Sequence, residues 1–296
     1  MFGELHTHII MDGVNYKDAV AIHRQGPCEA VVRERLEAYR SAGIAFIRDG
    51  GDHMGVSMLA RALAPEYGIK YLSPSHGIHR KGLYGAIVGH AFEDEYSMKA
   101  LIDSAAKDGA DFIKLMASGI LDFSEFGALS PGPLPKREIV SFVKHAHSLG
   151  LAVMVHVNGD ATVRDCIEAG ADSIEHGFYM HRGTLDLFRG DDAPVWVPTV
   201  AVTDALMGCG RFDEENLSRI HASQMANIRR ALEIGANVAL GSDCGAYRLP
   251  HPEGLGREYR CFRQAGEGIN DIDGMLERGE ALIRERFAER RNIRRP

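Results

Sequence analysis

The stretch "AHSLGLAVMVHV", residues 146–157, contains the pattern that decides the fold. A helix-forming segment ends at Gly150, and the seven residues after it are apolar except for His156. Glycine commonly ends a helix because it enters the left-handed region freely. The apolar run is too short for a core helix but has the length of a buried parallel strand. The stretch therefore predicts a helix followed by a buried strand.

The same arrangement recurs along the chain. It occurs six times, and two further apolar runs, at 3–10 and 193–200, bring the expected strands to eight. The other six are at 44–50, 69–75, 111–118, 151–157, 172–177 and 237–243. The intervening segments predict helices at 28–43, 54–67, 97–108, 135–149, 160–169, about 184–189, 213–234 and from about 255. Strands that alternate with helices indicate βαβ units and a parallel sheet.

Eight such units in a chain of 296 residues fit a closed (β/α)8 TIM barrel better than an open doubly wound α/β sheet. No G-x-G-x-x-G follows the first strand, which weakens the dinucleotide-binding alternative. No linker or shift in composition marks a second domain. We expect a single barrel domain over residues 1–296.

Composition narrows the classes of function. The chain is 45% hydrophobic and 25% charged, with a net charge of −7, which argues against nucleic acid or an anionic membrane as a partner. Five cysteines without a C-x-x-C pair argue against a disulfide framework or a zinc–cysteine cluster. Glu4, His6 and His8 stand where a signal peptide would be continuously apolar, and no apolar run of 18 residues, as a membrane span needs, exists. We therefore expect a cytoplasmic protein.

The first expected strand, "GELHTHII" at 3–10, carries His6 and His8 two residues apart. In a strand these side chains point to the same face, about 6 to 7 Å apart, which suits a chelating pair. A pair of hydrogen-bonded histidines on a buried strand is the alternative.

Polar residues also stand at the carboxyl ends of four later strands, where barrels carry their chemistry: Lys114, His156, His176 and Asp243. Each interrupts an apolar run, and burying such a group without a partner is costly. One buried histidine is usually a satisfied core residue. Six metal-competent groups on one rim, with His6 and His8 included, favour a metal site.

This constellation resembles the amidohydrolase superfamily. The matching features, over about residues 2 to 266, are H-x-H on the first strand, lysine on the fourth, single histidines on the fifth and sixth, and aspartate on the eighth. The segments "IKLMASG", "HVNG", "IEHG", "PTV" and "GSDCG" are similar to those of the branch that contains prolidase-like and imidazolonepropionase-like hydrolases.

The resemblance implies a centre of two divalent metal ions, with zinc as the expected metal. His6, His8 and Asp243 would hold one ion, and His156 and His176 the other. Lys114 would bridge both as a carbamate formed with CO₂, because an ammonium group cannot bind a cation. The alternatives are a lysine paired with an acid and a mononuclear, deaminase-like site.

The implied reaction is hydrolysis of an amide-type C–N bond, peptide-like or N-acyl or cyclic. Two ions sharing a water lower its pKa towards about 7, and Asp243 would accept the proton and pass it to the departing amine. A lactone or a phosphotriester would suit the same centre. A catalytically silent barrel is a further alternative, but no expected ligand is missing.

Candidate substrate contacts lie in the loops after the strands. By resemblance, His76 in the loop 73–85 and Tyr179 after the sixth strand are catalytic candidates, and the loop 120–135 and His251 could line the pocket. A solvated loop residue is the alternative for each. The expected partner is a small-molecule substrate, and the sequence leaves the oligomeric state open, with a homo-oligomer among the possibilities.

Two departures from the branch leave the substrate class open. Most of its members carry a small N-terminal β-sandwich, whereas the first expected strand here begins near residue 2, so we expect that domain to be absent. The Ala- and Thr-rich segment expected after "GREYRCFRQAG" is replaced by "GINDIDGMLERGEALIRERF".

Overall fold

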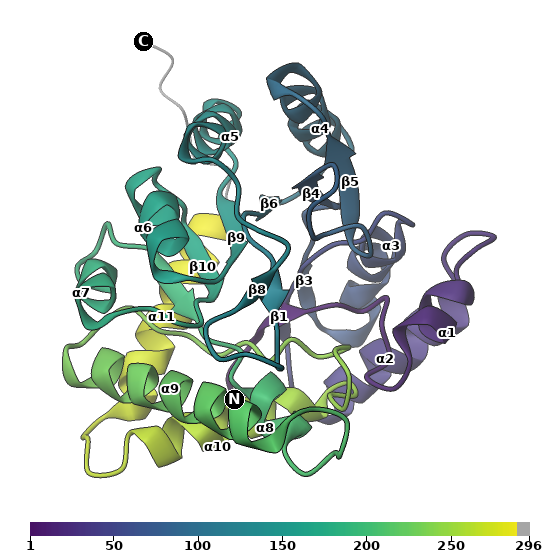
Figure 1. The fold of residues 1–296 in the computed structure, drawn as a ribbon. Helices are drawn as coiled ribbons and strands as arrows, with labels where there is room; N and C mark the ends of the chain where they lie inside the picture. Colours follow the sequence, from purple (N-terminus) through teal and green to yellow (C-terminus); the bar gives the residue numbers. More distant parts are fainter. Residues whose placement is uncertain (289–296) are drawn as a thin grey trace.

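The computed structural model describes residues 1–288. Its strands are β1 Glu4–Thr7, β2 Phe46–Asp49, β3 Lys70–Leu72, β4 Gly77–Arg80, β5 Gly89–Phe92, β6 Ile113–Met116, β7 Ile120–Leu121, β8 Leu129–Ser130, β9 Val153–Val157, β10 Ser173–His176 and β11 Val195–Val197. Its α-helices are α1 Tyr16–Ala21, α2 Glu29–Ser41, α3 Val56–Leu63, α4 Glu95–Lys107, α5 Lys136–Ser148, α6 Asp160–Glu168, α7 Arg182–Leu185, α8 Ala201–Leu206, α9 Glu214–Glu233, α10 Glu253–Ala265 and α11 Ile272–Ala288. Helices surround the central strands (Figure 1).

The strands pair in parallel, in the order β1-β2-β3 in one sheet and β11-β10-β9-β6-β4-β5 in the other, and β7 and β8 form a separate antiparallel hairpin. The six glycines of the repeated pattern all have left-handed φ angles, between 67° and 91°. The expected alternation of helix, glycine stop and parallel strand is confirmed, and the architecture is a TIM-barrel-like α/β fold.

The expected eighth strand, 237–243, is not a ladder strand. Its backbone nevertheless bonds on one side to β11, through Trp196 N to Asn237 O (2.9 Å), and on the other to β1, through Asp243 N to His6 O (2.7 Å). This segment thus lies between the edges of the two parallel sheets.

The expected third strand, 69–75, is observed only over Lys70–Leu72 as β3. β3 pairs with β2, whereas β4, which lies in the segment expected to be a loop, pairs with β6 and with β5. Asp111 N, just before β6, donates to Ser73 O, just after β3 (2.9 Å). Short strands such as β4 and β5 show no hydrophobic periodicity from which the sequence could predict them. The same holds for the six-residue helices α1 and α8.

The amino ends of the strands enclose a second, smaller core. Leu5, Phe46 and Met154 from three strands, and Phe112 just before β6, pack there with Ile283 and Phe287 of α11. Figure 1 shows α11, in yellow, running behind the strands. This packing fills one end of the fold and leaves the carboxyl ends of the strands for the site. Within residues 1–288, the helices are all too short or too polar to cross a membrane.

Candidate metal centre

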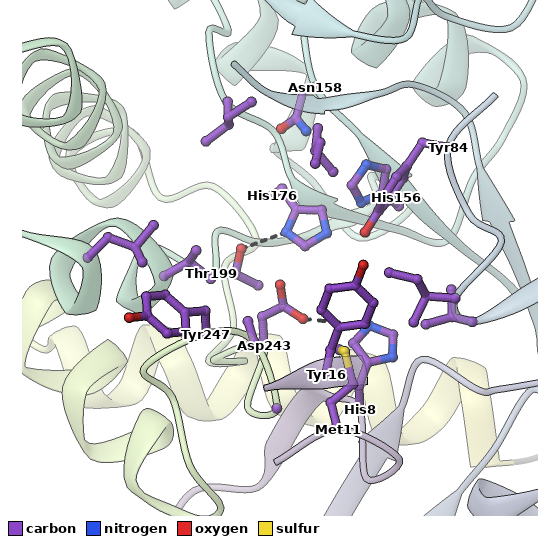
Figure 2. Close-up of a pocket in the computed structure, with 18 of the residues that line it drawn as sticks. His8, Met11, Tyr16, Tyr84, His156, Asn158, His176, Thr199, Asp243 and Tyr247 are labelled. Carbon is purple, nitrogen blue, oxygen red and sulfur yellow. Dashed lines mark hydrogen bonds and ion pairs between the residues drawn. The ribbon is translucent and has the colours of Figure 1, made fainter. Parts of the chain in front are cut away.

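A cavity of about 640 Å³ opens at the carboxyl ends of the strands. Five of the six predicted metal-site residues line it: His8, Lys114, His156, His176 and Asp243. Figure 2 shows His8, His156, His176 and Asp243 around its floor. His6, the sixth, is fully buried beside them.

The four histidine rings form a continuous group. The ring centroids of His6 and His8 are 5.4 Å apart, those of His6 and His176 4.8 Å, and those of His156 and His176 4.5 Å. Asp243 Oδ1 lies 3.6 Å from Nε2 of both His6 and His8. Potential ligand atoms of His6, His176 and Asp243 all lie within 4.8 Å of one another, so these three groups could share one ion.

In His6 and His176, a hydrogen bond at one ring nitrogen determines which nitrogen is available to bind a metal ion. His6 Nδ1 donates to Glu175 Oε2 (2.7 Å). His176 Nδ1 donates to Thr199 Oγ1 (2.7 Å), whose own hydroxyl proton goes to Pro198 O. Both Nε2 atoms are then unprotonated acceptors, as a metal-binding imidazole requires.

Glu175 is itself held by a buried network under the cavity. Arg48 Nη2 donates to Glu175 Oε1 (2.8 Å) and Arg48 Nη1 to Ser173 Oγ (2.8 Å), while Arg48 Nε donates to Leu5 O (2.8 Å). Arg48 and Glu175 have no exposed surface. A buried ion pair with all its hydrogen bonds made fixes its members in one arrangement, so the orientation of the His6 ring is fixed from below.

His156 and His8 are held in other ways. His156 Nε2 donates to Gly119 O (3.3 Å), which leaves Nδ1 as the acceptor. The His8 ring lies against Gly50, where an added Cβ would come within 2.1 Å of His8 Cε1. Glycine at position 50 is therefore required for the position of this ring.

Lys114 projects into the same group from β6. The side chain is 1% exposed, and Nζ has no hydrogen-bond partner among the residues that the structure describes. Burial lowers the pKa of Lys114 to about 8, against the opposing influence of Glu175. An unpartnered buried amine is costly for a protein to keep, which indicates that another group completes the site.

The electrostatics keep the imidazoles neutral. Burial, followed by the charge of Lys114, lowers the pKa of His8 and of His156 to about 3. Burial likewise holds the pKa of His6 and His176 well below the usual range, and it raises the pKa of Asp243 to about 7. Neutral imidazoles and a proton-accepting carboxyl are the forms that a cation site and a proton shuttle use.

The backbone at two of these residues is strained. His176 and Asp243 have φ angles of 69° and 60°, which non-glycine residues rarely adopt. The His176 carbonyl accepts hydrogen bonds from Trp196 Nε1 (3.0 Å) and Gln224 Nε2 (2.7 Å). These two buried donors hold the strained residue in place.

The predicted substrate residues lie outside this group. His76 packs against His90, with ring centroids 4.6 Å apart, and Tyr179 packs against Phe126 of the β7–β8 hairpin at 5.2 Å. Neither belongs to the residues that line the cavity. His251 bonds to Tyr39 Oη (2.7 Å) and Met11 O (2.9 Å) and also lies outside the lining.

Several residues of the site were missed by sequence reasoning. Tyr84 lines the cavity with its ring 5.0 Å from that of His156, and Figure 2 shows it beside that residue. Asn158 lines it as well, and its Oδ1 accepts from Phe178 N (3.0 Å). Asn158 follows His156 in "HVNG" and could have been noticed there, whereas Tyr84 stands in a loop with no distinguishing pattern.

The fold and the site define a class: barrel-like α/β proteins with histidines, a lysine and an aspartate gathered at the carboxyl ends of the strands. Within that class, the chain belongs to the amidohydrolase family, whose model matches residues 2–284. The resemblance seen in the sequence is confirmed.

Two curated relatives are similar over part of their length. Ochratoxinase of Aspergillus niger is 26% identical over 212 residues, which cover 69% of this chain and 42% of that protein. An uncharacterized protein of Mycobacterium bovis is 25% identical over 234 residues, 74% of this chain and 58% of that one. The chain thus spans about half the length of these relatives.

Solved structures share the fold at lower identity. A Xaa-Pro dipeptidase with bound methionine gives a TM-score of 0.76 at 19% identity, covering 96% of this chain and 75% of the other. A putative prolidase from Bifidobacterium longum gives 0.73 at 18% identity, covering 97% and 69%. At these identities the likeness shows the shared fold.

Proposed function

We propose that this chain is a metal-dependent hydrolase of amide-type C–N bonds, acting on a small molecule. The observation that carries the proposal is the convergence of neutral imidazoles, Asp243 and the unpartnered Lys114 Nζ on one cavity floor. Membership of the amidohydrolase family supports a hydrolase.

The residues present fit a pair of divalent ions, with zinc as our proposal. His6 Nε2 is buried without a hydrogen-bond partner among the described residues, so this nitrogen is available to bind a metal ion. His6, His8 and Asp243 would hold one ion, and His156 and His176 the other. Nitrogen and carboxylate ligands of this kind suit zinc.

Lys114 would serve this centre as a carbamate. Its amine must be neutral to attack CO₂, and burial lowers its pKa to about 8. Loss of one proton from the ammonium gives the neutral amine. Its attack on CO₂ forms an N–C bond and releases a second proton, so that a cationic side chain becomes an anionic one with two oxygens. An anion at this place would also remove the cost of the buried ammonium.

The ions would supply an acidified water and polarise the scissile carbonyl. Asp243 would accept the proton of that water and deliver it to the departing amine nitrogen. Its carboxyl suits this task because it is the one acidic side chain among the residues that line the cavity. Glu175 and Thr199 would keep the histidine rings oriented throughout.

Metal analysis and one substitution test the proposal. Protein purified with zinc and without chelators should contain about two ions per chain, and it should hydrolyse a member of a panel of N-acyl amino acids. Asp243→Asn should retain the fold and part of the metal, since an amide oxygen can coordinate, while kcat falls by about 10² to 10⁴ because the amide cannot accept the proton. Asp192→Asn, in an exposed loop, is the matched control.

Other outcomes would reject the proposal. Metal-free protein after gentle purification would exclude the metal centre. Turnover of lactones or phosphotriesters, with every amide left intact, would assign a different reaction to the same centre.

A further inference from the structure

Exposed apolar side chains gather at the opening of the cavity. Val14, Tyr16, Ile120 and Tyr247 are 70%, 44%, 44% and 38% exposed, and all four line the cavity. They come from three distant parts of the chain: the segment that begins α1, the β7–β8 hairpin and the loop after Asp243. Exposed apolar residues collected in this way mark a binding surface.

Further apolar residues line the same cavity. They are Met11, Phe123, Leu206 and Phe212. Figure 2 shows Tyr16, Tyr84 and Tyr247 placed around Asp243 and His176. The volume of about 640 Å³ is that of a pocket for a drug-sized ligand. The lining therefore favours a substrate that carries a large apolar group.

A cation stands at the same opening. The Arg211 guanidinium carbon lies 4.9 Å from the Tyr247 ring centroid and 5.4 Å from that of Phe212, and both rings line the cavity. A guanidinium stacked on aromatic faces keeps its N–H edge free for bidentate binding of a carboxylate.

The carboxylates beside Arg211 in the sequence are engaged elsewhere. Asp213 accepts from Asn216 N (2.8 Å) and Glu214 from Gly208 N (3.1 Å). Over residues 1–288, the ion pairs within 4.0 Å do not include Arg211. Lys17 and Lys114 also line the cavity, and Asp243 is the one acidic side chain of its lining. The opening thus has positive charge without an acidic partner.

We propose that the cavity takes an amphipathic anionic amide, with a large aromatic or aliphatic group against the apolar walls and a carboxylate bound by Arg211. This inference rests on the proposed function, since it assigns a substrate class to that same site. It makes Arg211 a specificity-determining residue of the loop between α8 and α9.

Binding of matched ligands tests the role of Arg211. The probes are N-(2-naphthoyl)glycine and its primary amide, titrated by calorimetry with the 296-residue chain as purified. Mass spectrometry confirms that the ligand stays intact. The carboxylate should bind at least about fivefold more tightly than the amide, because a charged hydrogen bond is added. Arg211→Gln should reduce this ratio to about one, and Arg211→Lys should retain part of it.

Arg219→Gln is the matched control. Arg219 also stacks on an aromatic ring, that of Phe126 at 4.7 Å, and its loss changes the net charge equally, but it does not line the cavity. This variant should keep the wild-type ratio. Equal binding of acid and amide by the wild type, or an unchanged ratio in Arg211→Gln, would overturn the assignment.

A second pair of variants tests the apolar walls. Val14→Ser combined with Ile120→Ser should weaken the binding of N-(2-naphthoyl)glycine several-fold, whereas Ile22→Ser should not. Ile22 is 51% exposed at the end of α1 but is not a lining residue. Equal loss in both variants would show that the apolar opening has no part in binding.

The two proposals fail separately. Selective binding of the carboxylate by a protein that hydrolyses no amide would reject the proposed function and keep the binding site. Hydrolysis of amides with no preference for an acidic apolar substrate would reject the inference and keep the function.

Discussion

Lys114 presents a conflict between stability and function that is confined to one residue. Its ammonium group is buried without a hydrogen-bond partner among the residues described, so the metal-free fold bears an uncompensated cost. A protein that served only as a scaffold would gain by replacing it with an apolar residue of similar size.

The substitution Lys114→Met should therefore act in opposite directions on stability and activity. The metal-free protein should gain about 1 to 3 kcal/mol of unfolding free energy, measured by urea denaturation in the presence of a chelator. Activity and at least one equivalent of bound metal should be lost, because methionine cannot form the carbamate. Lys99→Met, which replaces an exposed lysine of α4, should change neither the metal content nor the activity. A Lys114→Met variant with two ions and normal turnover would show that no bridge is formed there.

The residue scale also shows where sequence reasoning succeeded and where it could not. His6, His8, Lys114 and His156 were recognisable because each is polar within an apolar strand, and the structure brings them together. Glu175 was missed. Alternation along β10 places its side chain inside, with that of Ser173, and would send His176 outside. The positive φ of His176 brings that ring back to the site, and sequence does not reveal such a backbone angle.

At the scale of elements, the close approach between β2 and the end of β1 determines the position of His8. Gly50 follows β2 directly, and its missing side chain provides the space that the His8 ring occupies.

Gly50→Ala should displace that ring, since the new Cβ would lie 2.1 Å from His8 Cε1. We expect metal affinity to fall by at least about tenfold, a loss of the size seen when the supporting contacts of a metal ligand are changed, as measured by competition with a chromophoric chelator. Gly132→Ala is the control, because no heavy atom lies within 4 Å of its added Cβ. Wild-type affinity in Gly50→Ala would mean that His8 does not contribute a ligand.

Elements outside the repeated pattern were the ones that sequence did not predict. The helix–glycine–strand units were found because each carries a stop and an apolar run. The β7–β8 hairpin and α1, which shape the opening, are too short to show a period. His76 was expected to contact the substrate. Its ring lies against His90 of β5, outside the lining of the cavity.

At the scale of the whole molecule, buried histidines should make the metal-free protein sensitive to acid. The pKa of His8 and His156 is lowered to about 3, and that of His76 and His251 to about 4, with burial as the first cause in each. In the unfolded chain these groups take up protons near pH 6.5. Between about pH 6.5 and 4 the unfolded state therefore binds more protons, and the free energy of unfolding falls as the pH falls.

Four carboxyls act in the opposite direction. Burial raises the pKa of Glu4, Asp49 and Asp243 to about 7 and that of Glu258 well above its usual range, so the folded state binds more protons at these groups than the unfolded state on the acid side of those values. They offset part of the effect of the more numerous histidines. The net expectation is a lower Tm at pH 5.0 than at pH 7.5 in chelator-treated protein, measured by differential scanning calorimetry.

A pair of variants isolates one contribution to this pH dependence. His251→Gln should reduce the difference in Tm between the two pH values, whereas His181→Gln, at an 81% exposed side chain, should leave it unchanged. A Tm that stays constant or rises on acidification would contradict the assignment of these histidines as neutral, buried groups.

The packing of α11 against the amino ends of the strands determines the route by which substrate and products can reach and leave the cavity. Ile283 and Phe287 fill that end together with the side chains of the strands, so a small molecule cannot pass along the axis. Substrate entry and product release must therefore use the same opening. Each turnover requires the products to dissociate through this opening before the next substrate binds, so a slowly released product acts as a competitive inhibitor of the substrate.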